Sequence, residues 1–508
     1  MRLSKHLKPG DLFRLNDITR TFTEVPDALL PYTHSAETYF SLPPWEKLML
    51  AKVVVTDCMG SFELIKARCT NRDIAGIQGF YRPVFAQEEG VRPWHWTHLF
   101  IDEAAQAREP EALIPLLVVA PGTASSDIPM PKFILAGDSN QLGPGIVSPV
   151  SRQYGLHVSL FERLLNRSIY ADHPSARKNI WKRVEGKWYR PSFVNLIRNY
   201  RSHKGILMMP SAMFYNSTLL HEARNTTSLT QWTYLPNPEI PVLFHPCGGE
   251  ETWISDTAGW YNPHEIKITI MLIQHLLNTE NTPGTEVKAQ EIAVITPFRE
   301  HVVRARKAMR VKTVGLGAVN VGTVENYQGG ERRITILNCV RSTARFLEWD
   351  KKKGRGIVNQ KQRFNVAITR AKELLIIVGN PAILQVSLPQ KLILTDMKMD
   401  PYWRGYLSFI QRNNLSKEAF EFEEDKSTQW MSSLEKGMRI RDEVLNSAKG
   451  LGSGVGSWET DVYGEEGMWN IGSMLEEFIL AEDEWDDENQ QNGNETTTNG
   501  HSTVEIGT

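Results

Sequence analysis

Two short apolar runs that end in polar side chains constrain the fold of this chain more than any other feature. The run at residues 98–101 leads directly into Asp102 and Glu103, and the run at residues 133–137 leads into Asp138. Continuous apolar runs are typical of parallel strands buried under helices, and the carboxyl ends of such strands open into the crevice where α/β sheets bind ligands. The sequence therefore predicts an acidic site there, with a solvated helix cap as the simpler alternative.

Strand-like runs alternate with helix-like segments along most of the chain. This alternation is typical of a parallel sheet that helices cover on both faces. We therefore expect an α/β fold with two parallel-sheet domains. The expected strands include residues 52–56, 133–136, 292–296, 335–338 and 374–378, and the expected helices include residues 263–278 and 299–310.

Composition separates a folded core from an acidic tail. The chain has 508 residues, of which 41% are hydrophobic, and this is enough for at least two cores. The net charge of -2 hides a segregation of charge, because Asp and Glu are concentrated in residues 418–487 of the tail, and the core without this tail is basic. The segment from 490 to 508 is rich in Gly, Asn and Thr and has little to bury, so it cannot offset its ordering entropy.

We divide the chain into five regions on these grounds. Residues 468–480 are an exception within the tail, since apolar residues recur there at helical spacing, either as a partner-binding helix or as a stray amphipathic stretch. The regions are a first domain at 1–165, a polar joint at 166–188, a second domain at 189–389, an extension at 390–417 and a largely disordered acidic tail at 418–508.

Several classes of protein do not fit the sequence. The run at residues 112–120 is far shorter than the roughly 20 residues that span a bilayer, and the first eight residues lack a following apolar signal core. The cysteines are far apart, without the spacing of zinc ligands or of a disulfide framework. We expect an intracellular protein, cytoplasmic or nuclear, with no membrane contact. The four cysteines are Cys58, Cys69, Cys247 and Cys339.

Three later blocks supply groups that complement the acidic strand ends. Residues 199–202 offer an aromatic ring beside a guanidinium, and residues 324–331 offer a glycine turn with flanking polar groups. Residues 365–372 place Arg370 just before an apolar strand. Phosphoryl transfer needs Mg²⁺, positioned water and cations around the departing charge. Together the blocks predict a nucleotide site, although surface ion pairs would also explain the arginines.

In this order, the blocks resemble the motifs of superfamily 1 RNA helicases, specifically the nonsense-transcript-regulator and Armitage-type branch. The resemblance runs from about residue 8 to residue 381. It implies two RecA-like domains of the P-loop NTPase fold, the first truncated, with ATP and Mg²⁺ between them. The matching blocks are 102–106 (Walker B), 137–144 (motif III), 199–202 (motif IV), 324–331 (motif V) and 365–370 (motif VI), with smaller matches at 13–16, 53–56, 154–162 and 295–298.

The resemblance also implies a role for individual side chains in nucleotide binding and hydrolysis. Asp102 would hold Mg²⁺ through water, and Glu103 would orient the attacking water as general base. Gln141 would sense the γ-phosphate. Arg201 and Arg370 would reach the same phosphate as arginine fingers.

Further positions match the family's contacts with the nucleoside and with nucleic acid. Tyr200 would stack on adenine, and Glu331, beside the turn at Gly329, would accept hydrogen bonds from the ribose hydroxyls. The positions that would contact single-stranded RNA are Thr56, Pro297 and Thr323. That these three residues merely shape turns is an equal alternative.

The phosphate-binding loop of the family is missing from the sequence. No Gly-Lys-Ser/Thr tripeptide occurs, and Gly-Lys-Trp at 186–188 lacks the hydroxyl and the upstream glycines. Three explanations stay open: an incomplete gene model, which is the simplest, a truncated gene whose product cannot hydrolyse ATP, and an unconventional loop. We expect weak nucleotide affinity and no turnover by residues 1–508 alone.

The family likeness leaves three functions open. The first is an ATP-dependent helicase that moves on single-stranded RNA, as a monomer, with RNA-silencing or RNA-decay proteins as partners. The second is a remnant that no longer hydrolyses nucleotide and serves as an RNA- or partner-binding module. The third is a DNA helicase, which the lack of a nuclease carboxylate cluster or a cysteine-ligated cluster motif makes less fitting.

Overall fold

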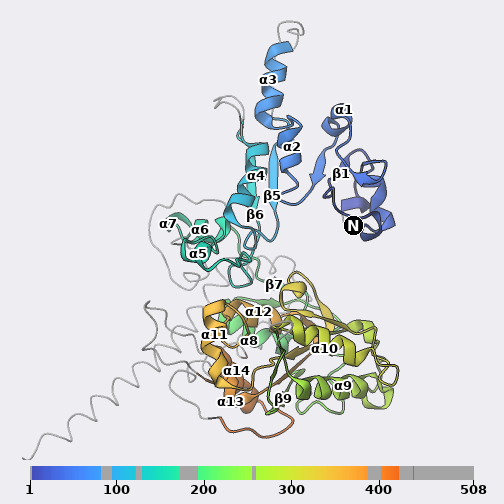
Figure 1. Cartoon of the computed structure of the whole chain (residues 1–508), viewed down its shortest axis with the longest axis vertical. Helices are drawn as coiled ribbons and strands as arrows, with labels where there is room; N and C mark the ends of the chain where they lie inside the picture. Colours follow the sequence, from blue (N-terminus) through green and yellow to red (C-terminus); the bar gives the residue numbers. More distant parts are fainter. Residues whose placement is uncertain are drawn as a thin grey trace, which may run out of the picture. The chain divides into compact units, whose positions relative to one another are not determined.

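The computed structural model describes residues 3–81, 94–121, 129–171, 193–254, 259–386 and 402–422, together with residue 439. The chain divides into two compact units (Figure 1), unit 1 at Met1–Asn166 and unit 2 at Arg167–Thr508. Both units contain parallel strands connected through helices, so the expected mixed α/β class is confirmed.

Unit 2 is built on a five-stranded sheet in which all strands are parallel. The strand order is β13-β12-β14-β15-β9. Every residue of β12 is buried, and so are the last five residues of β14. Burial on both faces explains why these strands have continuous apolar sequences. The strands are β9 (Val242–Pro246), β12 (Ile292–Thr296), β13 (Asn320–Thr323), β14 (Arg332–Asn338) and β15 (Ala371–Gly379).

Helices cover both faces of this sheet (Figure 1). On one face, α9 (Pro263–Leu277) and α10 (Arg299–Met309) share an apolar core with the strands. The side chain of Asn262 caps α9 by accepting hydrogen bonds from the backbone N–H groups of residues 264 and 265, and Pro263 occupies the first helical position. The other face carries α8 (Lys204–Phe214), α12 (Lys361–Ile368) and α14 (Tyr402–Arg412).

The residues after α14 return to the sheet and extend it beyond β9. The backbone N–H of Phe244 donates to the carbonyl of Leu415 (2.9 Å), and the N–H of Lys417 donates to the carbonyl of Phe244 (3.1 Å). On α14, Trp403 and Tyr406 pack against the ring of Phe364 on α12. The described part of the predicted extension at 390–417 is therefore part of the core of unit 2.

Smaller elements complete unit 2. They are the parallel pair β7 (Arg198–Asn199) and β8 (Leu220–His221), the antiparallel pair β10 (Thr252–Ile254) and β11 (Gly259–Tyr261), and the short helices α7 (Ser168–Ala171), α11 (Leu347–Lys353) and α13 (Pro381–Leu384).

Unit 1 contains strand pairs in place of one continuous sheet. Strand β1 pairs with β4 and β5 pairs with β6, both in parallel, while β2 and β3 are antiparallel. The strands are β1 (Leu12–Arg14), β2 (Ser35–Ala36), β3 (Tyr39–Phe40), β4 (Val53–Val55), β5 (His98–Ile101) and β6 (Lys132–Leu135). The helices are α1 (Trp45–Met49), α2 (Phe62–Lys66), α3 (Asn71–Tyr81), α4 (Glu109–Val119), α5 (Pro149–Gln153) and α6 (Leu160–Leu165).

The expectation that the strand at 98–101 is buried under helices is wrong for one of its faces. Leu99 packs against the apolar core of unit 1 and Ile101 is buried, but Phe100 is 71% exposed and Phe133 on the neighbouring strand is 43% exposed. The physical reason is that α4 contacts β5 from one side, while successive side chains of a strand point to opposite faces.

Several predicted features lie outside the described residues. These are most of the polar joint, from 172 to 188, and the acidic tail apart from residues 418–422 and 439, including the helix-like stretch at 468–480. Within the described ranges, no helix combines the length and the apolar character that crossing a membrane requires.

Candidate functional site

In unit 1 the two polar strand ends lie side by side, as the sequence predicts. Beyond β5, the backbone N–H of Ala104 donates to the carbonyl of Ala136 at the end of β6 (2.8 Å). A Cβ atom built on Gly137 would lie only 2.9 Å from the backbone nitrogen of Ala105. Glycine at 137 therefore allows the corner after β5 and the corner after β6 to come into direct contact.

The corner after β5 presents two carboxylates in different surroundings. Asp102 is exposed, and one of its oxygens accepts the backbone N–H of Glu103 (2.9 Å). Glu103 is partly buried, and its side chain accepts a hydrogen bond from Nε2 of Gln106 (2.9 Å). The backbone of Glu103 has φ of 50°, a left-handed conformation that costs a non-glycine residue about 1–3 kcal/mol. Such strain is common where a side chain must point in a fixed functional direction.

The corner after β6 holds its own carboxylate and amide together. Nε2 of Gln141 donates to one oxygen of Asp138 (3.0 Å), and the backbone N–H of Asn140 donates to the other (3.0 Å). The predicted phosphate sensor Gln141 is therefore oriented by the carboxylate of its own turn, close to the corner that carries Asp102 and Glu103.

These carboxylates fit a magnesium ion that is shared with a phosphate better than an ion held by protein alone. Among the described residues, no cluster of three or more His, Cys, Asp or Glu side chains could enclose a metal. Mg²⁺ usually binds through one or two carboxylates together with substrate phosphates and several waters. The exposed carboxylate of Asp102 meets this requirement.

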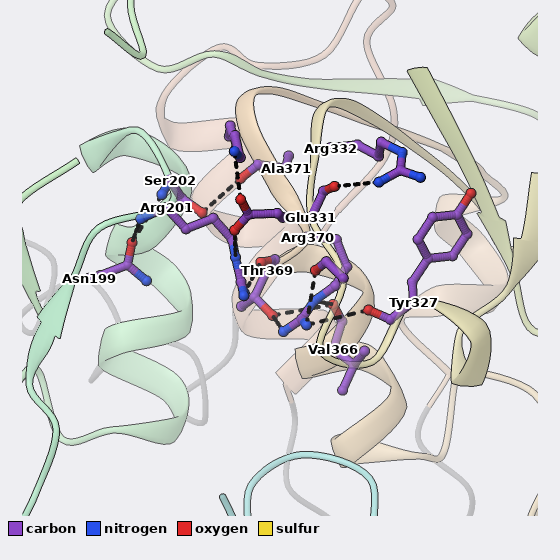
Figure 2. Close-up of polar contacts among 12 residues, drawn as sticks. Asn199, Arg201, Ser202, Tyr327, Glu331, Arg332, Val366, Thr369, Arg370 and Ala371 are labelled. Carbon is purple, nitrogen blue, oxygen red and sulfur yellow. Dashed lines mark hydrogen bonds and ion pairs between the residues drawn. The ribbon is translucent and has the colours of Figure 1, made fainter. Parts of the chain in front are cut away.

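In unit 2, residues from distant blocks form one polar cluster (Figure 2). Nε of Arg201 donates to one oxygen of Glu331 (3.0 Å), and Nζ of Lys372 lies 2.6 Å from the other. The guanidinium of Arg201 also donates to the carbonyl of Thr369 (3.3 Å). The structure thus brings together two predicted residues, Arg201 and Glu331. It adds Lys372, which sequence reasoning missed although it ends the block at 365–372.

Local hydrogen bonds fix the block that carries Arg201. The side-chain oxygen of Asn199 accepts from the backbone N–H groups of Arg201 and Ser202 (both 3.0 Å). The hydroxyl of Ser202 donates to the carbonyl of Ala371 (2.7 Å), and the N–H of His203 donates to the carbonyl of Lys372 (2.8 Å). The block is therefore bound to the first residues of β15.

The two cations keep Glu331 ionised. Burial by itself raises the pKa of Glu331, but hydrogen bonds and charges from Lys372 and Arg201 outweigh burial and hold the pKa below its usual range. The carboxylate is therefore an acceptor at neutral pH, as binding of ribose hydroxyls would require.

Arg370 lies inside unit 2 in this structure. Only 1% of the residue is exposed, and Nε donates to the carbonyl of Val366 (3.0 Å). The terminal nitrogens contact the carbonyl of Gly330 (3.4 Å). They also contact the hydroxyl of Thr369 (2.9 Å), which Figure 2 shows beside Arg370. Arg370 can therefore contact a phosphate outside the unit only after its guanidinium gives up some of these hydrogen bonds.

Two further predicted residues border this cluster. Tyr200 is 69% exposed, so its ring is open to stacking. Gly329 has φ of 72°, a left-handed conformation that glycine adopts without steric cost, and it precedes Glu331 in a turn closed by the N–H of Gly330 and the carbonyl of Tyr327 (2.9 Å). The turn delivers Glu331 to the amino end of β14.

The predicted RNA-contacting residues of unit 2 lie at the opposite edge of the sheet. Pro297 follows β12 and Thr323 ends β13, and the two strands pair with Thr296 opposite Thr323. The hydroxyl of Thr323 donates to the side-chain oxygen of Asn326 (3.0 Å). The two edges are separated by the length of a strand of five to seven residues, which is roughly 15–20 Å.

Thr56, the third predicted RNA-contacting residue, is in unit 1 just after β4. It is partly buried, and within the described ranges its hydroxyl oxygen has no hydrogen-bond partner. The position after a strand end matches that of Pro297 in unit 2. Whether Thr56 contacts RNA stays a prediction.

Comparisons with known proteins bear on both units. Two family models, each described as an AAA domain, match residues 91–149 and 156–382. The chain is 36% identical over 384 residues to "RNA helicase Mov10l1" of Homo sapiens, covering 75% of this chain and 28% of that protein.

Two other relatives have similar names. "Putative helicase MOV-10" of Gallus gallus is 30% identical over 443 residues, covering 84% of this chain and 40% of the relative. "Probable RNA helicase armi" of Drosophila melanogaster is 29% identical over 339 residues, covering 64% and 26%. The chain thus spans less than half the length of the curated relatives that it matches.

Proposed function

The chain carries the RecA-like core of a superfamily 1 RNA helicase of the Armitage-type branch, and from this premise we propose that the protein uses ATP to move along single-stranded RNA. The observation that carries the proposal is the ion pair of Arg201 with Glu331, next to the segment 369–370 that holds the buried Arg370; the three residues come from separate blocks of the sequence. Two guanidinium groups beside an ionised carboxylate match the phosphates and the ribose of a nucleotide.

Each unit would supply a different part of the reaction. In unit 1, Asp102 would hold a magnesium ion through water and Glu103 would take a proton from the attacking water. Mg²⁺, when bound, neutralises charge that develops on the transferred phosphoryl group. In unit 2, Arg201 and Arg370 would stabilise the same charge, and the exposed ring of Tyr200 would stack on adenine.

The sheet of unit 2 offers a physical route from nucleotide to RNA. The nucleotide residues are at the amino ends of β14 and β15, and Pro297 and Thr323 are at the carboxyl ends of β12 and β13. Since the strands between these edges are buried on both faces, the sheet would move as one body. Nucleotide bound at one edge of this sheet would then change the affinity for RNA at the other edge.

A second candidate follows from the missing phosphate loop. Without Gly-Lys-Ser/Thr, the 508 residues lack the backbone amides and lysine that normally hold the β- and γ-phosphates. By themselves they would then act as an RNA-binding module, with silencing or decay proteins as partners.

One experiment separates the two candidates. We would measure the anisotropy of a labelled oligouridylate bound to residues 1–508, with and without millimolar ATP and Mg²⁺, and phosphate release in parallel. The motor proposal predicts that ATP changes RNA affinity and that Arg201→Ala removes this change, even with no phosphate release. If ATP does not change the affinity for RNA, the result supports the binding module.

Two further results would overturn both candidates. Phosphate contacts make the affinity of a protein for single-stranded nucleic acid fall steeply as salt rises. An RNA affinity that stays constant between low and high salt therefore contradicts the proposal. A matched oligodeoxythymidylate that binds far more tightly than the oligouridylate would support the DNA helicase alternative.

A further inference from the structure

The β10–β11 hairpin places tryptophans at the edge of the sheet that carries the predicted RNA residues. It lies between the carboxyl end of β9 and the start of α9. Pro297 and Thr323 are likewise at the carboxyl ends of their strands, and Arg341 follows the carboxyl end of β14. In a parallel sheet these loops emerge at a single edge.

Three aromatic rings stand in contact at this edge, and we call them the aromatic ladder: Trp253, Trp260 and Phe346. Trp253 and Trp260 are opposite each other in the hairpin, with ring centroids 4.9 Å apart. Trp260 and Phe346 have centroids 4.2 Å apart. Residues directly opposite in an antiparallel pair share a face, so the ladder extends outward from Phe346 to Trp253.

A buried arginine joins the ladder to the residue after Pro297. The guanidinium of Arg341 lies 4.5 Å from the ring centroid of Trp260 and 4.7 Å from that of Phe298. Asp350 holds this guanidinium with two hydrogen bonds of 2.6 and 2.7 Å, and Arg341 is completely buried. The ladder therefore has a fixed position beside the end of β12.

Of the two acidic residues just before β10, Glu250 is exposed and Glu251 is turned away from solvent. The carboxylate of Glu251 accepts from the backbone N–H of Ser342 (2.9 Å) and the hydroxyl of Thr343 (3.1 Å), and it lies 3.5 Å from Arg341. Its side chain has no exposed surface. Glu251 thus anchors the hairpin, and its own charge is neutralised inside the unit beside Arg341.

The outer end of the ladder, at Trp253, is open, and a cation lies on the ring at its other end. Trp253 is 43% exposed, and its ring contacts that of Trp260. Arg345 is exposed, and its guanidinium lies 4.5 Å from the ring centroid of Phe346. A rigid aromatic face beside a cation is the combination with which proteins hold single-stranded nucleic acid, because any base can stack and the cation meets the phosphate.

We propose that Trp253 stacks on a base of the single-stranded RNA beyond Pro297, while Arg345 contacts a neighbouring phosphate. This inference rests on the proposed function, since it extends the RNA path across the carboxyl edge of unit 2. The strand would advance only when the stacked base leaves Trp253 and the next base takes its place, so that it moves by whole nucleotides. Stacking is indifferent to base identity, as a motor requires.

The test compares oligouridylate with an abasic oligomer of the same length, both measured by anisotropy against residues 1–508. Trp253→Ala weakens oligouridylate binding by about 5- to 100-fold, the range for losing one base–aromatic stack. The same variant leaves binding of the abasic oligomer unchanged, and Trp253→Phe restores most of the affinity. Met271→Ala is the matched control, because Met271 on α9 has the same 43% exposure but no ring.

Each outcome is decisive. If wild-type chain binds oligouridylate and Trp253→Ala binds it equally well, the stacking role is wrong while the proposed function stands. If the wild-type chain does not bind oligouridylate at all, the proposed function itself is wrong. If Trp253→Ala weakens both oligomers equally, the tryptophan supports the fold or a protein contact and does not stack on a base.

Discussion

The two units position their candidate site residues in different ways. In unit 1, side-chain hydrogen bonds at the acidic corners join near neighbours in the sequence, Glu103 with Gln106 and Asp138 with Gln141. In unit 2, Arg201 contacts Glu331 across 130 positions and Thr369 across 168. Local turns orient the side chains within each unit 1 corner, whereas the unit 2 cluster exists only when distant blocks of the sequence have come together.

This difference predicts which substitutions change the free energy of unfolding and which change only ligand binding. Contacts that join distant blocks contribute to the free energy of unfolding, so a change in the unit 2 cluster affects fold and activity together. An exposed carboxylate on a local turn contributes little to folding. We therefore expect substitutions in the unit 2 cluster to lower stability, and substitutions of the exposed unit 1 carboxylate to affect ligand binding alone.

Arg370→Ala should have the largest effect. The substitution removes a buried guanidinium and leaves several carbonyls without a donor, which costs about 3 kcal/mol of unfolding free energy. Hydrogen exchange of β14 and β15, followed by mass spectrometry, would measure the loss in unit 2 alone. Arg370→Lys is the control, since it keeps the charge but not the forked geometry. If hydrogen exchange of β14 and β15 is unchanged in Arg370→Ala, the expected role of the unit 2 cluster in stability is wrong.

Acidification should also destabilise unit 2. Burial lowers the pKa of His301 to about 3, whereas an unfolded histidine titrates near 6.5. Between these values the unfolded chain binds a proton that the folded chain does not, so stability falls as pH falls. The loss is at most about 1.4 kcal/mol for each pH unit below 6.5.

His301→Gln tests the origin of this pH dependence. The variant should lose stability less steeply between pH 6.5 and pH 4 in urea unfolding experiments. Some slope should persist, because burial also lowers the pKa of His203, to about 4. An identical slope in variant and wild type would show that His301 is not the titrating group.

Asp102→Asn should have the smallest effect on folding. Asp102 is exposed, and asparagine can still accept the N–H of residue 103, so the unfolding free energy should change by less than about 0.5 kcal/mol. The same variant should lose any effect of ATP and Mg²⁺ on RNA affinity. A destabilisation as large as that of Arg370→Ala would remove the distinction between the units.

Elements with strong local signals were predicted closely. The apolar run at 292–296 is strand β12 to the residue, and the helix expected at 263–278 is α9 at Pro263–Leu277. Asn262 and Pro263 define the start of that helix, and both are visible in the sequence. Unit 1 was predicted less well, because solvent exposure of Phe100 depends on which segments cover β5 and not on its own sequence.

The site shows the same limit. Resemblance to a family pointed to Arg201, Glu331 and Arg370, yet no pattern in the sequence indicated that Lys372 binds Glu331. That pair depends on the register in which Arg332 of β14 lies opposite Ala371 of β15. Register is a long-range property, set when the sheet assembles. The burial of Arg370 depends on the same assembly.

A substitution at Gly137 would change the shape of the predicted metal site without changing its charge. Replacing a carboxylate changes both the charge of a metal site and its shape. Alanine at 137 would keep every carboxylate and add one methyl group where a Cβ atom lies 2.9 Å from a backbone nitrogen of the facing corner. The added methyl group would move the two corners apart while the charge stays the same, so the dependence of ion affinity on geometry could be measured at constant charge.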